Sequence, residues 1–227
     1  MRNVFAKSLL AAAVAGSLFG AAGTASAEVS ASVAASSMYL WRGQNLTPDG
    51  AAVSGSLDYA HESGFYAGIW TSTETEGHET DLYAGFAGEV GGLGYNVGYF
   101  YYMYPEEVDL TVPERLSISD SAVADVYLGL TYGPAFVNLY QQVDDNADED
   151  LYYQVGFTYD KFTAFYGGWE LENSGPEYSH VQVDFAATDN LSFSVSKAFA
   201  DDDPVFGEPI VEEDPLFMVS YSLGFDL

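Results

Sequence analysis

Residues 217–227 decide the fold, and they read Phe-Met-Val-Ser-Tyr-Ser-Leu-Gly-Phe-Asp-Leu. Every second residue from Phe217 to Leu227 is apolar or aromatic, and all the residues between them except Met218 are small or polar. Alternation with a period of two predicts an extended strand with one apolar and one polar face. A chain that ends on such a strand, with a hydrophobic last residue, is typical of the closing strand of an outer-membrane β-barrel.

The other end of the sequence predicts export. Residues 1–27 resemble a secretory signal peptide, with Arg2 and Lys7 at the start, an apolar run over 9–22 and a small-residue cleavage pattern over 25–27. The apolar run is short for an uncleaved anchor helix. The mature domain, residues 28–227, contains no run of 18 apolar residues. A membrane location therefore requires a barrel, because in lipid only helices and closed barrels satisfy their backbone.

Charge and cysteine content restrict the partners. Loss of Arg2 and Lys7 leaves four basic residues against 34 acidic ones, a net charge of −30. Such a chain repels nucleic acid, so we expect no nucleic-acid partner. The charge fits either loops that face solvent or the attraction of cations. The absence of cysteine excludes disulfides and thiol chemistry.

Twelve strands are expected after the signal peptide. Frequent glycine and a 16% aromatic content suit strands and tight turns. The expected strands cover residues 29–40, 51–61, 65–73, 80–90, 94–104, 122–132, 135–143, 151–159, 162–171, 177–187, 191–199 and 216–227. The aromatic run Tyr99-Phe100-Tyr101-Tyr102 leaves the two faces of the fifth strand unassigned.

The connections alternate between short and long. The short ones are 62–64, 91–93, 133–134, 160–161 and 188–190, and the longer, more acidic ones are 41–50, 74–79, 105–121, 144–150, 172–176 and 200–215. This order predicts an all-β, antiparallel, up-and-down transmembrane barrel with tight turns at one rim and long loops at the other. An even strand number puts both termini at the short-turn, periplasmic rim, and strand 216–227 then pairs with strand 29–40.

One segment resembles a known family. Residues 39–43 read Tyr-Leu-Trp-Arg-Gly, and residues 57–68 read Leu-Asp-Tyr-Ala-His-Glu-Ser-Gly-Phe-Tyr-Ala-Gly. Together these elements resemble the N-terminal pattern of the TorF-type porin family, first described as a conserved hypothetical outer-membrane group. The resemblance covers residues 36–72. It implies an outer-membrane barrel with a passive transport role. Because the family has no established substrate, the resemblance does not indicate a solute.

Arg42 is the most informative single residue, since it is one of four mature bases and stands where the first strand meets the first long loop. It is either a rim arginine that pairs with loop acids or an inward arginine that pairs with a wall carboxylate such as Asp58. The other pore-lining candidates stand opposite apolar neighbours on their strands. They are Asp58, Asp81, Asp125, Gln154, Gln182 and Asp184.

Catalytic and metal-binding patterns are missing from the sequence. It contains three histidines, no His-Glu-x-x-His and no Gly-x-Ser-x-Gly, so we expect neither an enzyme nor a cofactor. Residues 144–150 resemble the start of an EF-hand loop, but Glu149 replaces the required glycine and Val155 the twelfth-position glutamate. Weak, exposed divalent binding at Asp144, Asp148 and Asp150 remains an alternative to simple solvation.

Three functions remain open. The main hypothesis is an outer-membrane porin-like channel with a negative wall, for passive diffusion of small cationic or neutral solutes. The second is a closed barrel, filled by Tyr152, Tyr140 and Trp70, that acts through its acidic loops in adhesion or surface structure. The third is a soluble periplasmic β-protein. For either barrel, the expected partners are outer-membrane lipid and lipopolysaccharide, and the sequence does not specify the solute or the oligomeric state.

Overall fold

The computed structural model describes residues 27–48, 50–75, 77–104, 123–143, 150–170, 178–200 and 211–227. The predicted signal peptide lies outside these ranges except for Ala27. Within them, no helix is long and apolar enough to cross a membrane. The strands are β1 (Glu28–Ser36), β2 (Leu40–Trp41), β3 (Gln44–Asn45), β4 (Ala52–Ala60), β5 (Phe65–Glu74), β6 (Gly77–Val90), β7 (Leu93–Met103), β8 (Val123–Tyr132), β9 (Ala135–Gln142), β10 (Leu151–Tyr159), β11 (Phe162–Glu170), β12 (Tyr178–Ala186), β13 (Leu191–Ala200) and β14 (Leu216–Asp226).

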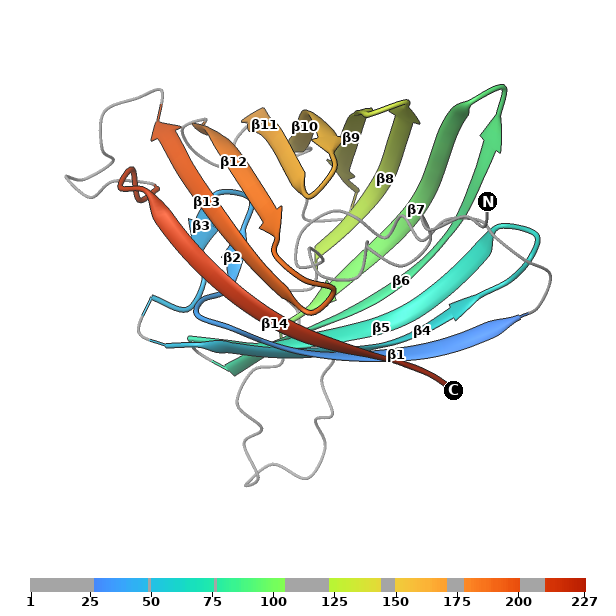
Figure 1. The fold of residues 1–227 in the computed structure, drawn as a ribbon, viewed down its shortest axis with the longest axis horizontal. Coiled ribbons are helices and arrows are strands. Elements are labelled where there is room, and N and C mark those ends of the chain that lie inside the picture. The colour runs from blue at the N-terminus through green and yellow to red at the C-terminus, as the bar shows by residue number, and fades with distance from the viewer. Residues whose placement is uncertain are drawn as a thin grey trace.

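Twelve of these strands form a closed antiparallel barrel, which confirms the predicted fold class (Figure 1). The twelve strands are β1 and β4–β14. Each of them pairs with the next barrel strand along the chain, and β14 pairs with β1 to close the cylinder. In that seam Ser30 lies opposite Asp226 and Ser36 opposite Ser220. The termini lie at the rim of the short turns, since Glu28 pairs with Ala60 just before the turn to β5. Closure leaves no unpaired strand edge, as a lipid-embedded sheet requires.

The predicted alternation defines two different surfaces. Apolar side chains point outward and remain exposed, and examples from successive strands are Val53, Leu57, Ile69, Leu82, Phe86, Val97, Val126, Val155, Val183, Val195 and Val219. Their neighbours along each strand point inward and are mostly polar, aromatic or small. In β7, Tyr99 points outward and is 46% exposed, whereas Tyr102 points inward and is buried. Aromatic residues suit both surfaces here, which is why sequence alone did not separate the two faces.

Two predicted boundaries are wrong. The first strand ends at Ser36 rather than at residue 40, and residues 40–45 form the separate hairpin of β2 and β3. The predicted long loop 74–79 is wrong, because β5 continues to Glu74 and β6 begins at Gly77. Gly77 has a φ of 132°, which favours glycine. Short and long connections therefore do not alternate strictly, and Glu79 is a strand residue rather than a loop residue.

Candidate functional site

The hairpin of β2 and β3 folds into the barrel instead of extending from its rim, and it lies behind β13 and β14 in Figure 1. Its turn residues Arg42 and Gly43 have φ values of 46° and 88°. Positive φ at both central residues is the geometry of a two-residue hairpin turn. Tyr39 anchors the base of the hairpin, since its carbonyl accepts from Leu46 N at 2.8 Å and its N–H donates to the Thr47 hydroxyl at 2.7 Å.

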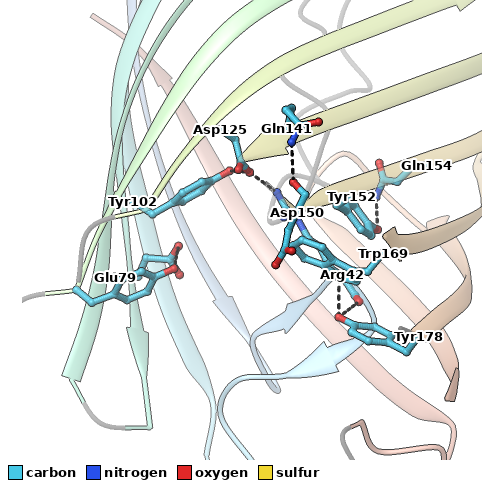
Figure 2. Close-up of polar contacts among 11 residues, drawn as sticks. Arg42, Glu79, Tyr102, Asp125, Gln141, Asp150, Tyr152, Gln154, Trp169 and Tyr178 are labelled. Carbon is cyan, nitrogen blue, oxygen red and sulfur yellow. Dashed lines mark hydrogen bonds and ion pairs between the residues drawn. The ribbon is translucent and has the colours of Figure 1, made fainter. Parts of the chain in front are cut away.

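This turn places the Arg42 side chain against the far wall (Figure 2). Arg42 Nη2 lies 2.8 Å from Asp125 Oδ2 on β8, and both side chains are at most 5% exposed. The Tyr102 hydroxyl donates to the same carboxylate oxygen at 3.1 Å. Burial alone would lower the pKa of Arg42, but the Asp125 carboxylate raises it above the ordinary value. The arginine therefore stays charged, and the pair is a buried ion pair with an additional hydrogen bond.

Aromatic rings surround the Arg42 guanidinium on its remaining sides. Its Cζ lies 4.5–4.7 Å from the ring centroids of Trp41, Tyr140, Tyr152 and Trp169. Such distances give favourable cation–π contacts, which gain strength where water is excluded. The rings also contact one another, with Tyr127 and Tyr140 centroids 4.7 Å apart. The arginine and these rings therefore fill one side of the barrel interior.

Direct contacts with β12 and β11 fix the hairpin in place. The Tyr178 hydroxyl donates to the Arg42 carbonyl at 3.0 Å and accepts from Gln44 Nε2 at 2.5 Å and Trp169 Nε1 at 2.8 Å. Gly43 packs on His180 so tightly that an added Cβ would lie 2.8 Å from the His180 ring. A glycine is thus required here both by space and by φ.

A chain of hydrogen bonds crosses the inner wall beneath this cluster. It runs from the Tyr127 hydroxyl to Asn138, from Asn138 to Gln154, and from Gln154 to Tyr152, at 2.8, 3.0 and 3.0 Å. Tyr152 then bonds His180 Nε2 at 2.7 Å. All of these side chains are buried. A fully partnered buried network of this kind holds the wall in one arrangement.

The opposite part of the wall carries much shorter side chains. On β1, β4, β13 and β14 the inward positions are mainly serine: Ser30, Ser32, Ser36, Ser54, Ser56, Ser192, Ser194, Ser196, Ser220 and Ser222. Ser36 bonds Ser220, and Ser32 bonds Ser56, both at 2.8 Å. The interior is therefore asymmetric, with bulky aromatic residues on β6–β11 and small hydroxyls on the strands beside the seam.

The predicted pore-lining residues Arg42, Asp58, Asp81, Asp125, Gln154, Gln182 and Asp184 all face this interior. They form several groups rather than one. Asp58 accepts from the hydroxyls of Tyr83 and Ser56, and Asp184 accepts from Gln182 Nε2 at 2.9 Å. The suggestion that Asp58 pairs with Arg42 is wrong, since Asp125 is the partner. Arg42 also lies inside the barrel, not among acids at the rim.

Only Asp150 of the three residues in the predicted divalent site is among the described residues. Asp144 and Asp148 lie outside the described residues. Asp150 is 7% exposed, so it is buried and not exposed as the divalent-site alternative expects. Among the described residues, no group of three or more histidine, aspartate or glutamate side chains is arranged to hold a metal ion.

Sequence reasoning missed the hairpin and the side chains that receive it, including Trp169, Tyr178 and Glu79. A usable signal was present, because Arg42-Gly43 stands between the short apolar pair Leu40-Trp41 and the polar pair Gln44-Asn45. The strand pattern predicts a loop over residues 41–50, between two strands. The partner of Arg42 is on β8, and no local pattern identifies so distant a contact.

Fold and interior together define a twelve-stranded barrel with an apolar exterior and a partly filled polar interior. Residues 20–153 match the model of a family described as bacterial protein of unknown function (Gcw_chp), and the chain belongs to that family. No curated protein sequence matches the chain.

Two solved porin structures have a similar fold. The KdgM porin is 10% identical, with a TM-score of 0.52 over 86% of this chain and 98% of its own. A structure of KdgM porin in complex with disordered oligogalacturonate is 9% identical, with a TM-score of 0.50 over 87% of this chain and 98% of its own. At such identity the similarity establishes the barrel fold alone.

Proposed function

We propose that this chain is an outer-membrane channel for passive diffusion of small solutes, of the TorF type that residues 36–72 resemble. Residues 1–27 are then a cleaved signal peptide, and residues 28–227 form the barrel. The exposed apolar side chains of the outer surface support a lipid environment. Lipid and lipopolysaccharide are the proposed surroundings of that surface.

One observation carries the proposal of a cation or neutral-solute preference. The buried carboxyl groups of Glu79, Asp81, Asp125, Asp150 and Asp184, together with the partly buried Asp58 and Glu74, stand against a single inward arginine or lysine, Arg42, among the described residues. Low-dielectric walls strengthen such a negative field, which attracts cations and repels anions. KdgM has been solved with oligogalacturonate, a polyanion. A polyanion would be repelled here, so we propose a different solute class.

The hairpin of β2 and β3 narrows the path on the aromatic side. Its tip is fixed by the Asp125 ion pair and by Tyr178, which leaves the serine-lined strands β1, β4, β13 and β14 as the proposed route. Small hydroxyls give a solute weak, exchangeable hydrogen bonds. Conduction requires such contacts, since binding must be weak enough to allow release.

The experiment is single-channel recording of the purified barrel in planar bilayers under a KCl gradient. The reversal potential is expected to indicate potassium preference. Asp58→Asn should reduce that preference, and Asp189→Asn, in an exposed turn, serves as the matched control. Chloride preference, or no conductance from correctly assembled protein, would overturn the proposal.

A closed barrel is the second candidate, and a specific observation favours it. Tyr140 and Tyr152 are buried in the interior as the plug hypothesis requires, whereas Trp70 is only partly buried. Such a protein would act through its acidic loops in adhesion. Deletion of residues 201–210 would then reduce surface binding while solute uptake stays unchanged.

A further inference from the structure

Two buried acids on β6 are not explained by the Arg42–Asp125 pair. Glu79 is 1% exposed, and Asp81, two residues further on the same inward face, is 8% exposed. Glu79 accepts hydrogen bonds from the Tyr39 hydroxyl at 2.8 Å and the Tyr104 hydroxyl at 3.3 Å. Asp81 Oδ1 is buried and has no hydrogen-bond partner among the described residues. A buried carboxylate oxygen without a partner is costly and requires an explanation.

These acids belong to a row that leads inward from the long-loop rim. Glu74 ends β5 at that rim, and its carboxyl group and that of Asp81 both lie against Glu79. Asp81 on β6 lies opposite Tyr102 on β7, and the Tyr102 hydroxyl donates to Asp125. The row thus extends from half-buried Glu74 to the Arg42–Asp125 pair.

Among the described residues, no basic side chain forms an ion pair with Glu79 or Asp81. Arg42 already donates to Asp125, while Lys161 is exposed and Lys197 contacts Phe199 on the outward face. A buried carboxylate must be paired, protonated or bound to a cation. No three acidic side chains here have a metal-binding arrangement. A primary ammonium group fits better, because it supplies several N–H donors to separate carboxylate oxygens.

We propose that Glu79 and Asp81 form a binding site for the ammonium group of a small amine. Asp81 Oδ1 accepts one N–H and the Glu79 carboxylate a second, while Tyr39 and Tyr104 hold Glu79 in position. The role of this site in transport rests on the proposed channel function. If the barrel is a channel, primary amines are the proposed solute class.

Thermal unfolding of the full barrel in detergent tests binding directly. Ethylammonium chloride is expected to raise Tm, whereas tetramethylammonium chloride, which has the same charge but no N–H donor, is not. Asp81→Asn should increase the half-effective ethylammonium concentration about tenfold, as the loss of one charge-assisted hydrogen bond implies. Glu79→Gln should do the same. Glu89→Gln removes a charge from the exposed end of the same strand and should leave the response unchanged.

Equal effects of both salts, or an unchanged response in both Asp81→Asn and Glu79→Gln, would overturn the site. The site would also be overturned if ethylammonium shifts Tm at neither pH 6 nor pH 8. That result is expected if the two carboxyl groups only share a proton. Bilayer recording separates the two proposals. Conductance that does not discriminate between the two salts would overturn the proposed amine site but not the proposed channel. A selective Tm shift without conductance would overturn the proposed channel but not the amine site.

Discussion

Arg42 and Asp125 meet inside the barrel at 2.8 Å although 83 residues separate them in the chain. Arg42 comes from the connection between β1 and β4, and Asp125 stands on β8, four strands beyond β4 around the cylinder. The pair therefore links a loop beside the seam to a distant part of the wall.

Removal of one partner of this ion pair should destabilise the barrel strongly. Arg42→Ala leaves the Asp125 carboxylate buried and unpaired, at an expected cost of about 3–5 kcal/mol. Urea unfolding in detergent measures the change. Arg42→Met combined with Asp125→Leu should recover most of the loss, because no uncompensated charge remains. Lys161→Ala, at an exposed turn, should stay within about 0.5 kcal/mol. Equal stability of Arg42→Ala and wild type would show that the pair is not formed.

The same arginine should limit conduction. Loss of the only described inward base makes the wall more negative and shortens a side chain in the interior. Arg42→Ala is expected to increase potassium preference and to raise conductance on the order of twofold. Recording in planar bilayers at low and high salt measures both, and high salt should weaken the change in preference. A shift toward chloride would contradict the expected sign.

The turn of the hairpin depends on Gly43. Gly43→Ala places a Cβ 2.8 Å from the His180 ring and puts alanine at a φ of 88°. We expect a loss of about 2 kcal/mol or more, since left-handed backbone and steric overlap add. Gly50→Ala is the control, because its Cβ meets nothing within 4 Å. The readouts are urea unfolding and proteolysis of the hairpin. Equal behaviour of the two variants would mean that the hairpin does not pack on β12.

The outer surface should show the depth dependence of a lipid-facing barrel. Val195, paired with Val183 and Phe217, is 41% exposed in the middle of β13. Val195→Arg is expected to cost about 2–4 kcal/mol when folding is measured in lipid vesicles. Asp189→Arg, in the exposed turn before β13, should cost little. If Val195→Arg folds into vesicles as well as Asp189→Arg, the surface does not face lipid.

Closure of the barrel should require the last residues. Phe225 pairs with Ala31, Asp226 pairs with Ser30, and Leu227 N donates to Val29 O at 2.9 Å. Deletion of residues 225–227 removes this end of the seam and is expected to block assembly, measured as loss of heat-modifiable migration in the outer-membrane fraction. Substitution of Phe225 by Leu keeps the backbone pairing and should assemble. Normal assembly of the deletion would contradict the role of the seam.

The fold was predictable because its main signal is local. Alternation in β4, β10, β12 and β14 gives both the strand and its outward face, and the short turns fix the up-and-down order. Acidic residues mislead at one point, since Glu74 and Glu79 predict a loop but lie in β5 and β6. Burial of Glu79 depends on two tyrosine hydroxyls that come from elsewhere in the chain.

The candidate site was predictable only in part. Inward positions such as Asp81, Asp125 and Gln154 follow from strand parity. The partner of Arg42 does not, because it depends on how far a connecting segment folds into the interior. Trp169 and Tyr178 receive the hairpin from strands more than 100 residues away, and neither differs in sequence from an ordinary strand aromatic.

The seam between β1 and β14 also constrains the order of folding. Its two strands are the first and the last of the barrel to be synthesised, so the cylinder has no closed form until β14 has been made. Contacts at such sequence separation form slowly, because the chain entropy must be lost before they stabilise anything. Until the last strand is added, the earlier strands keep unpaired edges and apolar outward faces, which makes the unfinished chain prone to aggregation.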